Sequence, residues 1–309
     1  MASTQTGLLS ARIELMRKGG NHIVDQLIAE RTTRISRHPL WPLLRPMLVK
    51  FLHYDEAVAM ADGIARLNAW DAFERVSELL SLDVTVENDH HLPKAGGFIL
   101  TLNHPTGIAD GIAVFDMLRE RRPDMKFFAN RDALRVSPGF RDMVIPVEWR
   151  AGQKSHGKSR DTLEEMSRAF SEDRPIVLFP SGRLAFWHEG RLTERPWQSS
   201  VVSLARRFNY PVVPAHIDAR NSGFFYLVSR FSSEIRDMTL FHELLNKKRK
   251  QFTISMGPAI SPDRLAGDPA AVAGALQDHI AVRMKDDPQA WFEGLESGEN
   301  HVHARKVVA

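Results

Sequence analysis

The chain has 309 residues, of which 43% are hydrophobic and 26% charged, and its net charge is +3. This composition is that of a globular protein, which excludes wholesale disorder, and the charge is too small to indicate a nucleic-acid partner. Because the chain contains no cysteine, disulfide frameworks, thiolate metal sites and cysteine nucleophiles are also excluded.

Residues 1–80 are predicted to be helical, because apolar side chains recur there at helical spacing. No run of about 18 uncharged apolar residues occurs, so neither a membrane-spanning helix nor a secretory signal is expected. The stretch WPLLRPMLVKFLHY (41–54) is apolar with basic side chains spaced through it. It is either a core helix with snorkelling cations or an interfacial helix lying on a membrane. Residues 56–82 are expected to continue as one amphipathic helix.

From about residue 83 short apolar or β-branched runs alternate with helical stretches. The expected strands are 82–87, 97–102, 126–129, 143–148, 175–180, 211–217 and 252–257, and the expected helices are 109–121, 158–171, 198–208, 240–250 and 268–284. This alternation predicts an α/β fold with a mostly parallel central sheet flanked by helices. We expect an N-terminal helical region over 1–80, the α/β domain over 81–285 and a tail over 286–309.

The segment LTLNHPTGIADG contains a histidine and an aspartate six residues apart. On one continuous helix His104 and Asp110 would point 240° apart, so they can meet only if the chain turns between them. Asn103 and Pro105 are expected to end the strand, and Gly107 permits a tight bend before a helix that has Asp110 in its first turn. The pattern is that of a base held by a carboxylate, although an N-cap aspartate beside a surface histidine is the alternative.

Two further segments end predicted strands with turn residues. In FPSGR, the residues Pro180, Ser181 and Gly182 precede Arg183, at the carboxyl end of a strand where α/β sheets bind ligands. An arginine there can bind a phosphate, although this segment taken alone favours an ordinary strand-ending turn with a solvated arginine. In VPAHIDARNS, Pro214 interrupts a strand that ends in a polar cluster.

The stretch between the first two segments is basic. Residues 121–160 contain ten basic and four acidic side chains, a net charge of 10 − 4 = +6. Such a stretch is either a solvated face or a surface for an anionic headgroup or an anionic acyl carrier.

In order and spacing, NHPTGIADG, FPSGR and VPAHIDARNS resemble the acyltransferase motifs of the glycerolipid (lysophosphatidic acid-type) acyltransferase superfamily. The likeness covers roughly residues 80–260 and is closest to the bacterial branch often labelled putative hemolysin. The common motif of the superfamily has four residues between its histidine and aspartate. Here five intervene, 105–109, and the hemolysin-labelled branch is similar to this sequence in that respect.

The resemblance implies an O-acyltransferase that moves a fatty acyl group from acyl-CoA or acyl-carrier protein to a hydroxyl of a lyso-lipid, without an acyl-enzyme, a bound cofactor or a metal. His104 would be the general base and Asp110 its orienting carboxylate. The residues expected at the acceptor headgroup are Arg150, Ser181, Gly182 and Arg183, and the supporting residues are Asn103, Gly107, Pro180 and Pro214. The enzyme would be cytoplasmic and peripheral on the inner face of the cell membrane.

One departure from the family concerns the acceptor. The family usually has a glutamate where Ser181 stands, so an acidic contact to acceptor hydroxyls is missing. This puts glycerol-3-phosphate and lysophosphatidic acid in doubt and favours an amino-acid lipid or another lyso-lipid.

Two other functions stay open. A lipid ester hydrolase could use the same pair to activate water, although no G-x-S-x-G motif is present. A catalytically inactive lipid-binding protein of the same fold is the other alternative. The histidine-rich DHH (89–91) and HVH (301–303) lack partners for a metal site.

Overall fold

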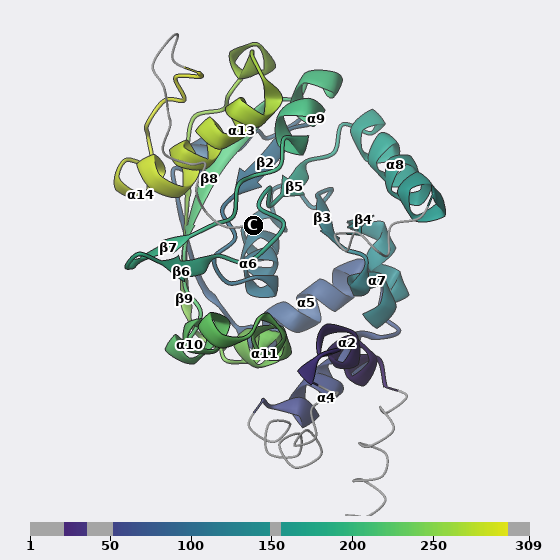
Figure 1. The fold of residues 1–309 in the computed structure, drawn as a ribbon. Coiled ribbons are helices and arrows are strands. Elements are labelled where there is room, and N and C mark those ends of the chain that lie inside the picture. The colour runs from purple at the N-terminus through teal and green to yellow at the C-terminus, as the bar shows by residue number, and fades with distance from the viewer. Residues whose placement is uncertain (1–21, 36–51, 149–155, 296–309) are drawn as a thin grey trace, which may run out of the picture.

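The computed structural model describes residues 22–35, 52–148 and 156–295 (Figure 1). Its centre is a seven-stranded sheet with the strand order β1-β9-β8-β2-β5-β3-β4. The strands are β1 (Asp83–Glu87), β2 (Ile99–Leu102), β3 (Lys126–Asn130), β4 (Val144–Val147), β5 (Ile176–Leu178), β8 (Val212–Asp218) and β9 (Gln251–Met256). Each of the seven predicted strands is therefore present.

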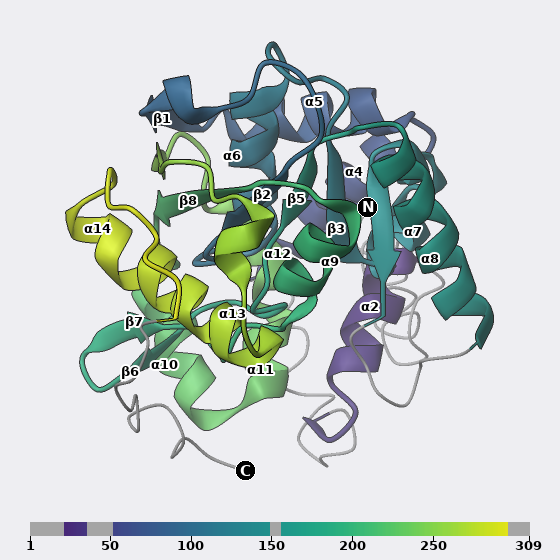
Figure 2. The ribbon, with the colours of Figure 1, turned by 90° about the horizontal axis from the view of Figure 1, so that it is seen from above.

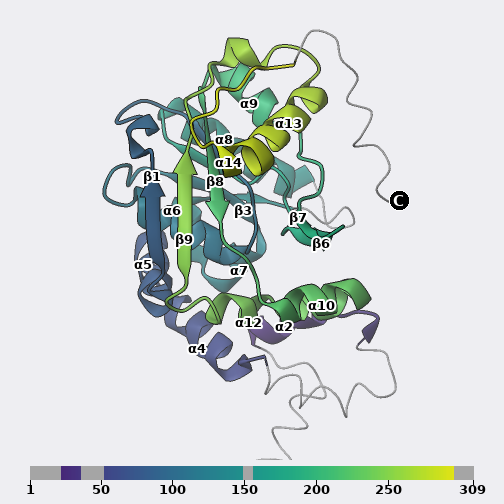
Figure 3. The same cartoon turned by 90° about the vertical axis from the view of Figure 1, so that its left-hand side faces the viewer.

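The sheet is mostly parallel, as the sequence predicted. Five of its six pairings are parallel, and the exception is the antiparallel pair β8 and β9. Since β1 is parallel to β9, these two strands run opposite to the rest at one edge, as Figure 3 shows. All residues of β2 and β5 are buried, which explains why these strands read as continuous apolar runs.

Helices cover both faces of the sheet (Figure 2). One core contains side chains of α5 (Ala69–Leu80) and α6 (Ile108–Leu118). Here Phe73 of α5 stacks on Phe115 of α6 and Phe127 of β3, with ring centroids 5.1 Å apart in both pairs. The other core contains side chains of α8 (His156–Ser171), α9 (Ser200–Phe208) and α13 (Pro269–Asp278). The fold class is thus α/β, with two helical layers.

The N-terminal region differs from its prediction, because 56–82 is two helices and not one. Helix α4 (Tyr54–Ile64) ends before α5 begins, and Asn68 precedes α5. The Asn68 side chain accepts a hydrogen bond of 2.9 Å from the backbone N–H of Asp71. An asparagine that caps the next helix favours a break at that position over a continuous helix.

Helix α2 (Ile23–Arg31) packs on α4 and on α12 (Leu240–Leu245), which lies far along the chain. Of the apolar stretch 41–54, residues 41–51 lie outside the described residues. Along the part of the chain that the structure describes, no helix has the length and apolar character needed to cross a bilayer.

Several elements were not predicted. They include a hairpin of β6 (Phe186–His188) and β7 (Arg191–Thr193), and the helices α7 (Asp132–Val136), α10 (Gly223–Phe231) and α11 (Ser233–Met238). The predicted final helix divides into α13, a π-helical segment (His279–Arg283) and α14 (Met284–Asp286). Short 3-10 turns are η2 (Asp89–His91), η3 (Pro138–Asp142) and η5 (Pro262–Leu265).

Candidate active site

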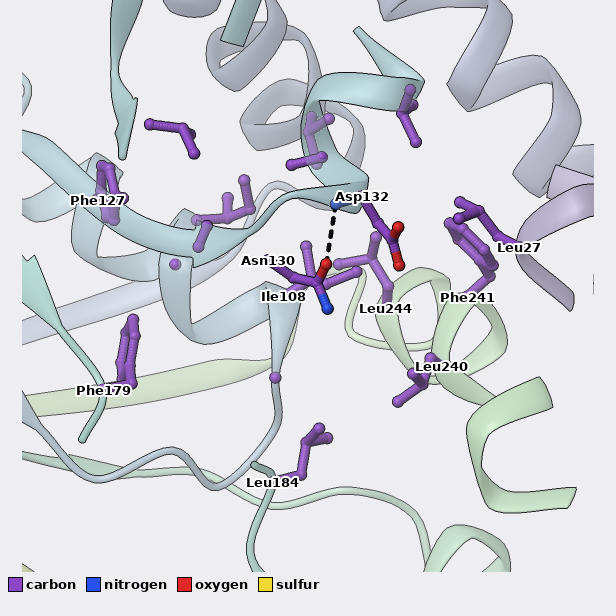
Figure 4. A pocket seen from close by; sticks show the side chains of 18 of the residues that line it. Leu27, Ile108, Phe127, Asn130, Asp132, Phe179, Leu184, Leu240, Phe241 and Leu244 are labelled. Carbon is purple, nitrogen blue, oxygen red and sulfur yellow. Dashed lines mark hydrogen bonds between the residues drawn. The ribbon is translucent and has the colours of Figure 1, made fainter. Parts of the chain in front are cut away.

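A cavity of about 370 Å³ opens at the carboxyl ends of β2, β3 and β5. Its wall is mostly apolar and comes from distant parts of the chain, as Figure 4 shows. Lining side chains include Leu27, Ile108, Phe127, Phe179, Leu184, Leu240, Phe241 and Leu244. The polar groups at the wall are few, and His104 is one of them. Such a cavity suits a long apolar ligand with its reactive end at a small number of polar groups.

The chain turns between His104 and Asp110 as the sequence predicted. Strand β2 ends at Leu102, Gly107 has φ of 93°, and α6 begins directly after it with Asp110 in its first turn. Nδ1 of His104 lies 2.9 Å from Oδ2 of Asp110. The aspartate is fully buried, whereas the histidine side chain is 18% exposed. With Nδ1 against the carboxylate, the opposite edge of the ring, which carries Nε2, is the edge available to the cavity.

The Asp110 carboxylate is fixed by donors of its own turn. The backbone N–H groups of Thr106 and Gly107 each donate to Oδ2 at 2.9 Å, and the Thr106 hydroxyl donates to Oδ1. The imidazole meets this fixed carboxylate at close range but at an angle, without the straight geometry of a hydrogen bond. The carboxylate therefore orients the ring mainly through its charge and position.

The residues beside His104 hold its main chain and ring in place. The Asn103 amide donates to the Ile217 carbonyl at 2.9 Å and accepts from the Ile217 N–H at 2.7 Å, which ties the end of β2 to β8. The His104 ring stacks on Phe179, with centroids 4.4 Å apart. In β8, the Pro214 carbonyl accepts a 2.9 Å hydrogen bond from the Gly257 N–H. The proline thus contributes an acceptor to the sheet, although it has no N–H to donate.

The FPSGR segment forms a tight turn at the cavity. Gly182 has φ of 59°, and its N–H donates to the Phe179 carbonyl at 3.0 Å. Ser181 is buried, and its hydroxyl donates to the Arg183 carbonyl at 2.8 Å. The Pro180 carbonyl accepts from the Gln198 N–H at 3.0 Å. Ser181 and Pro180 thus hold the turn, and Gly182 and Arg183 line the cavity.

Of the two predicted headgroup arginines, the structure brings one to the site. Arg183 is exposed at the cavity wall and forms no ion pair with any described residue. Arg150 lies outside the described residues. A contact between Ser181 and an acceptor stays a prediction.

The basic stretch 121–160 is largely neutralised by ion pairs. Among its described side chains, seven pair with carboxylates: Arg121, Arg122, Lys126, Arg131, Arg135, Arg141 and Arg160. For these seven, the interpretation as an anionic-ligand surface is therefore not favoured.

One residue at the site was not foreseen from the sequence. Glu194 follows β7 and is buried, and its carboxylate accepts hydrogen bonds from the His104 backbone N–H and, at 2.7 Å, from the Trp197 indole N–H. Burial raises the pKa of Glu194 to about 7. No sequence motif marked this glutamate, because the hairpin that carries it was itself not predicted.

The structure thus places a His–Asp pair at the rim of a mostly parallel sheet, open to an apolar cavity. Residues 83–218 match the acyltransferase family model. This match and the curated relatives described below support the resemblance to the glycerolipid acyltransferase superfamily.

Two curated relatives are lyso-glycine lipid O-acyltransferases. The chain is 27% identical to that of Phocaeicola vulgatus over 221 residues, which is 69% of this chain and 77% of the relative. It is 26% identical to that of Bacteroides thetaiotaomicron over 220 residues, which is 69% of this chain and 79% of the relative. Among solved structures, the 1-acyl-sn-glycerophosphate acyltransferase PlsC of Thermotoga maritima is 14% identical, with a TM-score of 0.46 over 81% of this chain and 98% of PlsC.

Proposed function

We propose that this chain is a lipid O-acyltransferase in which His104 is the general base and Asp110 orients it. The observation that carries the proposal is the His104 ring at the cavity wall with the buried Asp110 carboxylate 2.9 Å behind Nδ1. The family match and the names of the curated relatives support the same reaction class.

The proposed step moves an acyl group directly between two bound molecules. Nε2 of His104 takes the proton of the acceptor hydroxyl, and the hydroxyl oxygen attacks the carbonyl carbon of a thioester. The carbon–sulfur bond then breaks, and the proton passes from the imidazolium to the leaving thiolate. Asp110 stabilises the imidazolium between these events. A chain without cysteine suits this route, since no cysteine acyl-enzyme is needed.

The cavity is the proposed binding site of the fatty acyl chain. Its wall is built from aliphatic and aromatic side chains, with His104 at the end where the FPSGR turn lies. Each methylene that leaves water for such a wall contributes about 0.8 kcal/mol of binding free energy. Binding the chain in this way fixes the distance between the reacting carbonyl and the imidazole, which is the requirement for an efficient transfer.

The proposed acceptor is a lyso-lipid with an amino-acid headgroup, and the proposed donor is acyl-CoA or acyl-carrier protein. Two lyso-glycine lipid O-acyltransferases are among the relatives, and the serine at 181 removes the acidic contact that a glycerol acceptor would use. Arg183 is available at the cavity wall to bind an anionic group of either molecule.

The reaction is tested with purified protein, a panel of labelled acyl-CoA and acyl-carrier-protein donors, and lyso-lipids with glycine, other amino-acid and glycerophosphate headgroups. Transfer to the glycine or another amino-acid lyso-lipid that is lost in His104→Ala supports the proposal. The matched control is His90→Ala, an exposed histidine of η2, which should transfer at the wild-type rate. Release of the acyl group to water without transfer would favour a hydrolase, and no chemistry would favour a lipid-binding protein.

The enzyme is further proposed to act while peripheral on the inner face of the cell membrane, where its lipid acceptor is found. Large apolar side chains are exposed on the β6–β7 hairpin and the neighbouring α10: Trp187 (49%), Leu227 (55%) and Phe231 (80%). The hairpin lies next to α10 (Figure 3). The Trp187 and Tyr226 ring centroids are 5.9 Å apart. Exposed Arg230 adds a positive charge that anionic lipid attracts.

The membrane proposal predicts that Trp187→Ser with Phe231→Ser reduces binding to phosphatidylglycerol-containing vesicles at least about tenfold, because aromatic side chains anchor proteins at the interface. Vesicle flotation measures the bound fraction. Trp291→Ser is the matched control, since Trp291 is 63% exposed but lies after α14. Equal flotation of all three proteins would refute the role of the hairpin and α10.

A further inference from the structure

We propose that Glu194 is a positioning residue for the reaction, because its carboxylate holds the backbone of His104 and thereby sets where the imidazole stands. The inference rests on the proposed function for its catalytic consequence. The contact itself is independent of that function, and joins residues 90 positions apart in the chain.

The hairpin segment holds His104 at both main-chain groups. The His104 N–H donates to Oε1 of Glu194, directly after β7. The His104 carbonyl accepts a 3.0 Å hydrogen bond from the Ala185 N–H, directly before β6. The two ends of the hairpin thus fix the peptide groups on either side of His104. Asp110 and Phe179 contact the ring itself. Together with the two backbone hydrogen bonds, these contacts fix the position of the imidazole.

Glu194 is itself held by buried neighbours. Its second oxygen, Oε2, accepts from the Trp197 indole N–H at 2.7 Å, and Trp197 is buried. The Trp197 backbone N–H donates to the Gln277 side chain of α13 at 3.1 Å, and Gln277 donates to the Arg195 carbonyl, also at 3.1 Å. Both carboxylate oxygens therefore face donors, an arrangement that only the ionised carboxylate satisfies in full.

The charge state of Glu194 is sensitive to its surroundings. Burial raises its pKa to about 7, and the Trp197 hydrogen bond lowers the pKa, as do the backbone bond from His104 and the charge of His104. The charge of Asp110 raises it, and the Gln277 amide that faces it from α13 is uncharged. As the pH falls through about 7, Glu194 gains a proton, and its hold on the His104 N–H weakens.

Anchoring a loop with a buried ionisable carboxylate costs more free energy than anchoring it with a neutral acceptor. A backbone carbonyl or an amide would accept the His104 N–H without the desolvation free energy of a charge. Glu194 does not line the cavity, so contact with the substrate does not explain its presence. Its hydrogen bond to the backbone N–H of His104 does explain it, since a charged acceptor binds a backbone N–H more strongly than a neutral one.

The kinetic test compares Glu194→Gln with the wild type. The amide leaves one of the two donors facing an NH₂ group, so kcat should fall at least about tenfold while KM changes less than about threefold. The pH profile of kcat should lose one ionisation near neutral pH. Trp197→Phe keeps the carboxylate but loses the donor that lowers its pKa, so the same ionisation should move to higher pH.

A second measurement reads the contact without activity. In a two-dimensional NMR spectrum, the His104 amide proton should lie far downfield above pH 7 and move upfield as the pH falls. In Glu194→Gln the resonance should be upfield at all pH values. Should Glu194→Gln fail to fold, the shift in Trp197→Phe decides the question.

The proposal is overturned by a Glu194→Gln enzyme with wild-type kcat and an unchanged pH profile, or by an amide resonance that does not titrate with Glu194. Absence of acyl transfer in the wild type would refute the proposed function instead, and the NMR titration would then still decide whether Glu194 holds His104.

Discussion

At the scale of single residues, the His104 imidazole is backed by a carboxylate that is itself fixed in place. Asp110 is fully buried, and its oxygens already accept three hydrogen bonds from Thr106 and Gly107. The carboxylate therefore cannot swing away from Nδ1 without breaking those bonds. His104, in contrast, stays partly exposed at the cavity, as the proposed general base requires.

Replacing the charge behind the ring should reduce the chemical step more than substrate binding. Asp110→Asn is expected to lower kcat about 10²–10⁴-fold, because the neutral amide stabilises neither the imidazolium nor the productive tautomer. Steady-state kinetics on folded protein measures the effect. Thr106→Val, which loses one donor to the carboxylate and keeps its charge, should lower kcat less than about tenfold. A twofold change or less in Asp110→Asn would contradict the assigned role.

The raised pKa of Glu194 also predicts how stability depends on pH. With a pKa of about 7 in the folded state and an ordinary value of 4.5, the folded protein binds one more proton than the unfolded chain between these pH values. The contribution of Glu194 to stability is therefore fully present below about pH 4.5 and falls by about 3 kcal/mol as the pH rises to 7. Thermal melts between pH 5 and 8 should show a smaller loss of Tm in Glu194→Gln than in the wild type. Parallel curves would contradict this prediction.

At the scale of elements, two turns meet beside His104. The β2–α6 turn contains Gly107, and the turn after β5 contains Leu184. A Cβ atom built on Gly107 would lie 2.9 Å from Cδ2 of Leu184, and the φ of 93° at this position favours glycine. Glycine is therefore needed here for two separate reasons, the backbone angle and the close approach of the second turn.

These two reasons can be separated by substitution. Gly107→Ala should lower the free energy of unfolding by about 1–3 kcal/mol from backbone strain, with a further loss from the clash. Adding Leu184→Ala should relieve the steric clash but not the backbone strain. The double mutant should therefore lose less unfolding free energy than the sum of the losses in the two single mutants. Gly111→Ala is the control, since no atom lies within 4 Å of its added Cβ and helix α6 should gain about 0.5–1 kcal/mol. Chemical denaturation measures all four, and additive losses would contradict the contact.

At the scale of the whole molecule, the cavity joins segments that lie far apart in the chain. Leu27 of α2 lies on the same wall as Leu244 of α12, with the sheet and α6 on the other side (Figure 4). A ligand that fills this cavity touches the N-terminal helices, the sheet and the late helices together. Its binding free energy therefore stabilises the fold as a unit.

A non-transferable thioether analogue of long-chain acyl-CoA should raise the Tm of the wild type. At 100 times its Kd, the stabilisation amounts to about 2.7 kcal/mol. Gly111→Leu should remove most of this shift, because Gly111 lines the cavity and its added side chain has open space to enter. Coenzyme A without the acyl chain is the control and should produce a much smaller shift in both proteins. An equal shift with coenzyme A alone would locate the binding energy outside the cavity.

The parts of the molecule that could be predicted are those with a strong local sequence pattern. The strands were recognisable because β2 and β5 are buried, so all of their residues except Thr101 are apolar. The helices α10 and α11 were missed because they are short, at 9 and 6 residues, and so contain no long periodic run. The break before α5 was missed because apolar periodicity resumes immediately after Asn68.

The sequence by itself determined the α/β class and the meeting of His104 with Asp110, because both follow from residues that are neighbours in the chain. Six positions with a proline and a glycine between them leave the turn few conformations. Only the tertiary structure decided that Glu194 reaches His104, that α2 and α12 share a cavity wall, and that most of the basic stretch is neutralised. Most of these contacts join residues tens to hundreds of positions apart, so they depend on the order of strands in the sheet and not on local pattern.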